Sequence, residues 1–137
     1  MNSAFHLSLP CKNIVTTEKF YSDELGFELG RKTTEWIDVN LCNHQITFVL
    51  VDKFKFDYPN YDFDEGNLPS FHFGVILDID SWEEMYNRIN YWSSDIITKK
   101  TFLKGKSGEH SSFFIKDPNG YFIEFKSFIK EDNMFLM

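Results

Sequence analysis

Asp117-Pro118-Asn119-Gly120-Tyr121-Phe122-Ile123-Glu124-Phe125 is the stretch of this sequence that says most about its fold. Its first four residues predict a tight turn, because proline presets φ and Asn-Gly accepts a positive φ at little cost. The aromatic and β-branched residues that follow predict a buried strand. With the two-residue period of a strand, Glu124 shares a face with Phe122. A buried carboxylate is stable only when cations or hydrogen-bond donors meet it, so we expect a partner for Glu124.

The composition predicts one compact domain with a large core. The chain has 137 residues, of which 42% are hydrophobic and 18% are aromatic, which suits a single domain over residues 1–137. Its net charge of −7 argues against nucleic acids and anionic membranes as partners. No apolar run reaches the roughly 20 residues of a membrane span, and the N-terminus lacks a signal-peptide pattern. Cys11 and Cys42 are both expected to be buried, so we predict a reduced, soluble, cytoplasmic protein.

The first half of the chain is predicted to follow the order β-α-β-β-β. Residues 5–9 alternate like a strand, which ends at Pro10. Asn13 is a candidate N-cap for a helix that runs through Glu24 and ends at Gly26. Three further strands are predicted at 27–34, 36–41 and 44–51, the last two joined by a turn at Cys42-Asn43.

The second half repeats this order. Residues 71–77 predict a strand, and Asp80 or Ser81 is the expected N-cap of the helix that follows. Three strands are then predicted at 96–103, 110–116 and 121–128. Phe5-His6 and Phe71-His72 open the two halves in the same way, which is typical of an internal repeat. The expected fold class is α+β, with two βαβββ modules at about 4–51 and 71–128 linked by 52–70.

The connection at 52–70 mixes acidic, basic and aromatic residues. One interpretation is a solvated connection whose aromatic rings pack on the domain. The other is a lid or wall over a pocket, because long loops without secondary structure of their own are often functional. The sequence leaves both interpretations open.

His6, His72 and Glu124 are the candidate metal ligands. Two imidazoles and a carboxylate on strands form the donor set of a facial triad, which suits Fe(II), Mn(II), Ni(II), Co(II) or Zn(II) and leaves positions open for a substrate. The alternative is structural: each histidine could be a hydrogen-bonded core residue, and Glu124 could pair with Lys126. The matching positions of the two histidines in the repeat favour a divalent metal ion, whose identity stays open.

These features together resemble the vicinal oxygen chelate superfamily, which includes glyoxalase I, extradiol dioxygenases, and fosfomycin- and bleomycin-resistance proteins. The resemblance rests on the double βαβββ order, on His6 and His72 at the first strands, and on the DPNG-x-x-x-E signature that ends at Glu124. It covers about residues 4–128. It implies an open, incomplete β-barrel with helices outside, a divalent metal ion, a small-molecule substrate that chelates the ion through two neighbouring oxygens, and a homodimer. The site would lie within one chain or across the dimer interface.

Members of the glyoxalase I type carry a fourth ligand late in the last strand of the first module. Matching Asn43 to Gly120 places Thr47 at that position, and a shift of one pleat places Val49 there. Neither side chain is a good ligand, and Gln45 on the same face could reach a metal only in another register. The resemblance therefore implies a His-His-Glu site of the extradiol dioxygenase type more than glyoxalase I activity.

Two classes of function follow from these residues. The first is a metal-dependent dioxygenase or lyase, in which His110 is a weak candidate for the general base because it begins a strand beside the loop at 104–109. The alternative for His110 is a surface position at the start of that strand. The second class is a bleomycin-resistance-like protein that binds an aromatic or cationic ligand without catalysis. The aromatic content and the negative net charge favour such a ligand.

Overall fold

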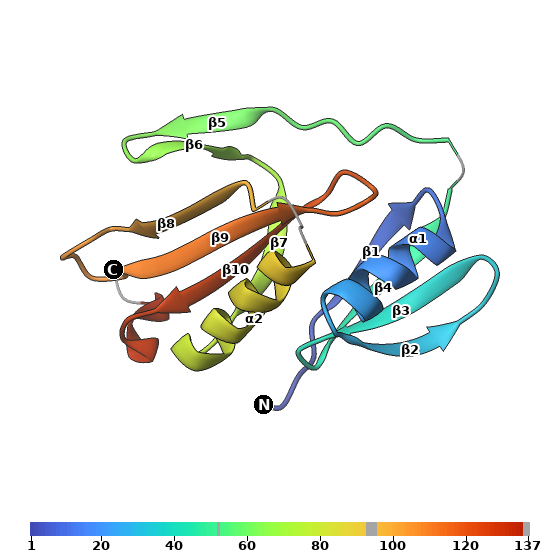
Figure 1. Ribbon diagram of the computed structural model, residues 1–137, viewed down its shortest axis with the longest axis horizontal. Helices are drawn as coiled ribbons and strands as arrows, with labels where there is room; N and C mark the ends of the chain where they lie inside the picture. The colour runs from blue at the N-terminus through green and yellow to red at the C-terminus, as the bar shows by residue number, and fades with distance from the viewer. Residues whose placement is uncertain (52, 93–95, 136–137) are drawn as a thin grey trace. The chain divides into compact units, whose positions relative to one another are not determined.

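The computed structural model describes residues 1–51, 53–92 and 96–135 and divides the chain into two compact units (Figure 1). The first unit comprises residues 1–56 together with the turn at 117–120, and the second comprises residues 57–116 and the chain from Tyr121 onward. Each unit contains one four-stranded mixed sheet. The predicted α+β class with two βαβββ modules is confirmed, and both sheets are open rather than closed on themselves.

The first unit packs its helical segment on one face of its sheet. Its elements are β1 (His6–Cys11), α1 (Ile14–Glu18), the π-helix η1 (Lys19–Glu24), β2 (Glu28–Lys32), β3 (Trp36–Leu41) and β4 (His44–Leu50). The strand order is β1-β4-β3-β2, and β1 runs parallel to β4. The helix starts where predicted, because the Asn13 side chain accepts a hydrogen bond from the Thr16 N–H. Cys42 and Asn43, with φ of 52° and 68°, form the tight turn between β3 and β4.

The Asp117–Gly120 turn is held in the first unit by buried hydrogen bonds. The Tyr21 hydroxyl donates to Asp117 Oδ2 over 3.0 Å. The Asn119 amide accepts from the Lys12 N–H over 2.9 Å and donates to Thr17 Oγ1 over 3.2 Å. Both turn side chains are almost fully buried. The Asp and Asn of the signature therefore have a structural role, which fixes the turn from which β10 (Phe122–Phe128) begins.

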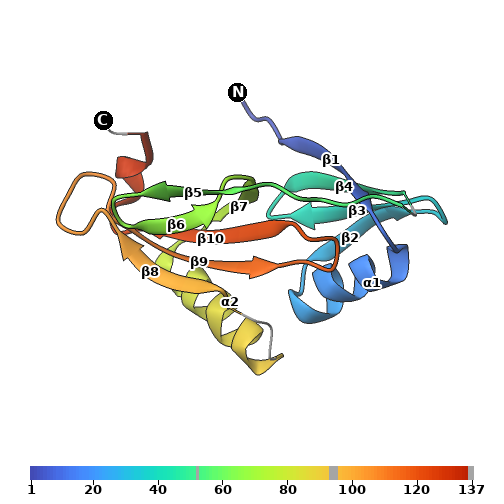
Figure 2. The same cartoon turned by 90° about the horizontal axis from the view of Figure 1, so that it is seen from above.

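The second unit repeats the order of the first and adds a hairpin. Its elements are β5 (Asn60–Phe63), β6 (Gly66–Pro69), β7 (His72–Ile76), α2 (Ile79–Tyr91), β8 (Thr98–Phe102), β9 (His110–Lys116), β10 and the 3-10 helix η2 (Glu131–Phe135). The sheet order is β7-β10-β9-β8, with β7 parallel to β10. Strands β5 and β6 form a separate two-stranded sheet, on the side of the large sheet opposite α2 (Figure 2).

Two local predictions are wrong. Helix α2 is capped by Asp78, whose side chain accepts from the Ser81 N–H, and not by Asp80 or Ser81. Cys42 is exposed at its turn, whereas Cys11 is buried as expected. In both cases the local turn geometry decides which side chain caps the helix or is exposed. The apolar periodicity of the flanking segment does not predict this. No helix in the described part of the chain is long and apolar enough to cross a membrane.

Candidate functional site

Glu124 lies in the middle of β10, a strand that is paired on both sides, with β7 and with β9. It pairs with Gly74 on β7 and with Phe114 on β9. A Cβ at position 74 would lie 1.7 Å from the Glu124 carbonyl oxygen, so only glycine fits there. The Glu124 side chain shares its face of the sheet with Phe122 and Lys126, as the strand period predicts. Glu124 is 8% exposed and therefore needs partners for its charge.

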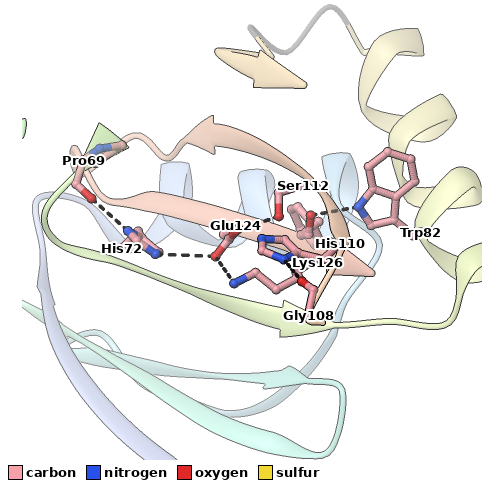
Figure 3. A network of polar contacts seen from close by, with 9 residues as sticks. Pro69, His72, Trp82, Gly108, His110, Ser112, Glu124 and Lys126 are labelled. Atoms are coloured by element: carbon pink, nitrogen blue, oxygen red, sulfur yellow. Dashed lines mark hydrogen bonds and ion pairs between the residues drawn. The ribbon is translucent and has the colours of Figure 1, made fainter. Parts of the chain in front are cut away.

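Three side chains meet the Glu124 carboxylate (Figure 3). The Ser112 hydroxyl donates to Oε1 over 2.7 Å. His72 Nε2 and Lys126 Nζ each lie 3.4 Å from Oε2. His72 Nδ1 lies 2.9 Å from the Pro69 carbonyl oxygen. Because a carbonyl only accepts, Nδ1 carries a proton in either charge state of the ring; Nε2 then donates to Glu124 when the ring is protonated and presents its lone pair there when the ring is neutral.

The charges of this group are coupled. Burial by itself raises the pKa of Glu124, but hydrogen bonds from His72 and Ser112 and the charge of Lys126 outweigh it and hold that pKa below its ordinary value. The hydrogen bond to Glu124 raises the pKa of His72, against the opposite effect of burial. The carboxylate is therefore ionised, and its Oε2 faces Lys126 and His72.

The carboxylate opens into a cavity of about 260 Å³ made entirely of second-unit residues. Its apolar walls are Tyr61, Phe63, Leu68, Phe102 and Leu103, and its polar lining is Glu65, His72, His110, Glu124 and Lys126. The β5–β6 hairpin supplies part of both sets. This arrangement supports the interpretation of residues 60–69 as a wall over a pocket. An aromatic lining with a few convergent polar groups is typical of a small-molecule site.

His110 is held in this cavity by rings and by one hydrogen bond. Its ring stacks on Phe102 with centroids 5.3 Å apart and contacts Phe128 at 5.2 Å. Its Nδ1 lies 2.8 Å from the Gly108 carbonyl oxygen, so Nε2 is the nitrogen left for a ligand. His110 therefore lines the same cavity as His72 and Glu124 and is not an isolated surface residue.

His6 lies on β1 in the first unit, paired with Gln45 and exposed. Among the residues that the structure describes, no group of three His, Cys, Asp or Glu side chains is gathered closely enough to hold a metal ion. The structure thus brings together His72, Glu124 and His110. The complete His6-His72-Glu124 set stays a prediction.

The position equivalent to Glu124 in the first module is Thr47. Strand pairing matches Ser8 with Thr47 and Gly74 with Glu124, in line with the register inferred from the two turns. Thr47 Oγ1 donates to Asp38 Oδ1 over 2.6 Å, and the Gln45 amide donates to Asp38 Oδ2 over 3.0 Å. Both side chains thus serve a carboxylate of their own sheet.

Sequence reasoning missed Ser112 and the carbonyl of Pro69. The sequence analysis offers Lys126 as a partner for Glu124, and the two residues lie on the same face of β10. Ser112 lies on another strand, and its partnership with Glu124 depends on the β9–β10 register. The Pro69 contact depends on the course of the β6–β7 connection. No local sequence pattern reports either of them.

Solved structures share this fold over nearly the whole chain. A glyoxalase/bleomycin resistance protein/dioxygenase from Alicyclobacillus acidocaldarius is 24% identical, with a TM-score of 0.81, and the match covers 98% of this chain and 96% of that one. The fosfomycin resistance protein FosX from Listeria monocytogenes is 13% identical (TM-score 0.69, 98% of both chains). A lactoylglutathione lyase from Agrobacterium tumefaciens is also 13% identical (TM-score 0.66, 100% of this chain and 98% of that one).

No family model and no curated protein matches the sequence. At these identities the likeness to solved structures establishes the fold. The chain has the vicinal oxygen chelate fold, as the resemblance predicted.

Proposed function

We propose that this chain is a metal-dependent enzyme that acts on a small molecule in the cavity of its second unit. His72 and Glu124 would supply two ligands to the ion, and His6 is the predicted third. One observation carries the proposal: His72 Nε2 and Glu124 Oε2 converge, while the other atom of each group is already bound, Nδ1 to Pro69 and Oε1 to Ser112. Histidine ligands in metal sites are oriented by such a second hydrogen bond.

The donor atoms fit a shared divalent ion. Zinc lies about 2.0–2.2 Å from imidazole nitrogen and carboxylate oxygen, which separates two tetrahedral ligands by about 3.4 Å. His72 Nε2 and Glu124 Oε2 are 3.4 Å apart. This is long for a hydrogen bond but suits two ligands of one ion. Nitrogen and carboxylate donors accept iron, manganese, nickel, cobalt or zinc, so the metal's identity stays open.

Several residues of the cavity have a part in this proposal. A bound divalent ion would supply Lewis-acid polarisation of a substrate oxygen or, if it is iron, a place for dioxygen chemistry. The rings of Tyr61, Phe63 and Phe102 would form the apolar wall against the ligand. His110 Nε2 would take or return a proton, since its other nitrogen is engaged by Gly108. Lys126 offers positive charge to an anionic oxygen of the substrate.

Within this class we favour a dioxygenase or lyase over glyoxalase I activity. The support is the hydrogen bond from Thr47 to Asp38, which occupies the hydroxyl at the position of the fourth ligand. Three protein ligands would leave room for a substrate with two neighbouring oxygens. A homodimer belongs to the same proposal, and light scattering after size exclusion tests it.

Metal content is the decisive experiment. Protein purified without chelator or nickel resin is analysed for metals, beside His6→Ala, His72→Ala and Glu124→Ala. We expect about one transition metal ion per chain, lost in each of the three variants. His44→Ala is the matched control, since this histidine accepts a hydrogen bond from the Phe5 N–H in the first unit and is expected to leave the metal in place. A metal-free wild type under metal-replete conditions would contradict the proposal.

A second candidate is a metal-free binding protein, and Lys126 favours it. Its ammonium group already lies 3.4 Å from Glu124 Oε2, so the carboxylate has a cation without any metal. The aromatic cavity would then hold an aromatic or cationic ligand by stacking and cation–π contacts. The two candidates separate in the same experiment: if wild type and all three variants fold and contain no metal, the binding protein is the better conclusion.

A further inference from the structure

The first unit has a cavity of its own, of about 430 Å³. It lies on the face of the sheet that bears Asp38 and Gln45. The other face, with Ile37 and Phe48, is buried against the helical segment, as the contact between the Phe48 and Tyr21 rings shows. The cavity is lined by Ala4, Gly30, Arg31, Asp38, Val39, Asn40, Asn43, His44 and Gln45. The function proposed above uses none of these side chains.

The floor of this cavity is a buried carboxylate that is fully hydrogen-bonded. Asp38 is 4% exposed. Thr47 donates to Oδ1 over 2.6 Å, whereas Gln45 and Arg31 donate to Oδ2 over 3.0 and 3.2 Å. With three donors, one of them cationic, the charge of Asp38 is compensated from within the unit. It therefore presents little negative potential to a ligand.

A β-bulge aims Arg31 at this carboxylate. Strand pairing matches Leu29 with Val39 and Lys32 with Ile37, which leaves both Gly30 and Arg31 opposite Asp38. In a regular strand the residue after Gly30 would point to the helical face, and the extra residue turns it back. A Cβ at position 30 would lie 3.0 Å from the Asp38 Cβ, so glycine permits this close approach. Bulges of this kind often re-aim a side chain beside a functional site.

The Arg31 guanidinium is held by contacts within the unit and is nevertheless exposed to solvent. Its Nε donates to Asp38, and its Cζ lies over the Trp36 ring, 5.1 Å from the ring centroid. The side chain is nevertheless 76% exposed. Because Asp38 engages only Nε, the two terminal NH2 groups remain as an oriented fork, the geometry that binds carboxylate or phosphate in a bidentate manner.

Two other polar side chains that line the cavity, His44 and Asn40, also offer donors. His44 Nδ1 accepts from the Phe5 N–H over 3.1 Å, so the neutral ring carries its proton on Nε2. The Asn40 side-chain oxygen accepts from the Asn43 N–H over 2.7 Å, which leaves its NH2 group to donate. Asp38 is the single carboxylate among the described lining residues, and it is already compensated.

From these contacts we infer a second binding site, built of first-unit residues around Arg31, that takes the carboxylate or phosphate group of a small molecule. The bulge, the cation–π contact with Trp36 and the buried Asp38 together orient the arginine. The surrounding amide and imidazole donors complete the oxyanion's hydrogen bonds. The volume of the cavity leaves room for an organic body beyond the oxyanion itself.

The side-chain Nε–H signals of arginine in nitrogen-15 NMR test this inference directly, because the chain has only Arg31 and Arg88. Acetate and inorganic phosphate are titrated separately at constant ionic strength, with chloride as the reference salt. We expect saturable shifts of the Arg31 Nε–H and of the Trp36 indole, without a matching shift at Arg88. The stronger of the two anions identifies the group that the natural ligand carries.

Two lysine variants provide the matched control. Arg31→Lys keeps the positive charge beside Asp38 but loses the fork, so we expect anion affinity to fall about tenfold. Arg88→Lys, on helix α2 of the other unit, should leave the affinity unchanged. Non-saturating shifts of equal size at both arginines, or unchanged anion affinity in Arg31→Lys, would overturn the inference. The metal content of Arg31→Lys should equal that of wild type, so this test and that of the metal site fail independently.

Discussion

The two sheets share one plan but centre on different carboxylates. In the first sheet the Asp38 carboxylate on β3 accepts hydrogen bonds from Thr47, Gln45 and Arg31. In the second sheet Glu124 on β10 receives Ser112, while His72 and Lys126 lie at a longer 3.4 Å. In the internal repeat Thr47 is the equivalent of Glu124, and Asp38, which pairs with Thr47, is the equivalent of Phe114, which pairs with Glu124. In the first module the carboxylate lies on β3 and its hydroxyl donor on the last strand, β4. In the second module the carboxylate lies on the last strand, β10, and its hydroxyl donor on β9.

This difference shows what each carboxylate can do. All the polar contacts of Asp38 are short, so it serves to orient its donors, above all Arg31. Glu124 has one oxygen in a short hydrogen bond and the other facing two groups at a distance, so it can still accept a cation. This contrast supports the proposal that Glu124, unlike Asp38, takes part in ligand binding.

Of the substitutions proposed here, Thr47→Glu should change stability most, because it adds a second carboxylate to the Asp38 centre. The new carboxylate would stand beside Asp38, where Thr47 now donates over 2.6 Å. A second carboxylate at this half-buried position would repel the buried Asp38, so we expect a loss of about 3 kcal/mol in the free energy of unfolding at pH 7. Thr47→Val is the control, which loses one hydrogen bond to a charged group, about 1.5 kcal/mol. Denaturant unfolding measures both variants. A stable Thr47→Glu protein that binds additional metal would show that this position can act as a ligand.

Ser112→Ala should weaken the second centre by an intermediate amount. It removes the 2.7 Å hydrogen bond to Glu124 Oε1, and a buried bond to a charged acceptor contributes about 2 kcal/mol. If Glu124 binds metal, loss of this orienting contact should also lower the metal affinity about 10- to 100-fold. Unfolding and a competitive chelator titration give the two values.

Ser127→Ala is the matched control on the same strand pair. Ser127 is 3% exposed and its hydroxyl has no hydrogen-bond partner among the described residues. Removing it should change stability by less than about 0.5 kcal/mol or increase it. Equal losses in the two variants would contradict a specific role of Ser112.

Lys126→Val converts the second centre toward the first, because Val49 is the repeat equivalent of Lys126. Removing an ammonium group beside Glu124 removes repulsion against a divalent cation, so we expect metal affinity to rise about tenfold, or about 1.4 kcal/mol. Lys116→Val on β9, whose ammonium lies over Phe122, is the control with the same change of net charge. A fall in metal affinity in Lys126→Val alone would show that the lysine supports the site instead.

The smallest effect concerns the pH dependence of the metal-free protein. The pKa of Glu124 is lowered from 4.5, so its stabilisation exists above that pH and is lost as the pH falls. The pKa of His72 is raised from 6.5, so its stabilisation exists below that pH and is lost as the pH rises. The stability difference between wild type and His72→Gln, measured in chelator, should therefore be greatest between about pH 4.5 and 6.5. A difference that is constant from pH 4 to 8 would contradict an ion pair.

Much of this molecule could be predicted because its signals are local or repeated. The Asn13 cap, the Cys42-Asn43 turn and the positions of the strands follow from turn chemistry and apolar periodicity. Glu124 was found because a charge interrupts an apolar strand. The hairpin at 60–69 was missed because its strands are short and mostly exposed, so they lack the apolar alternation of a buried strand.

The sequence by itself determined the repeat, the α+β class and the candidates His72, His110 and Glu124, since period, turn residues and charge placement can be read along the chain. Only the tertiary structure decided which groups form hydrogen bonds or ion pairs with Asp38 and Glu124. Ser112, the Pro69 carbonyl and the bulge at Gly30 and Arg31 act through strand register and chain crossing. Register is set by the packing of whole sheet faces, so no short segment encodes it.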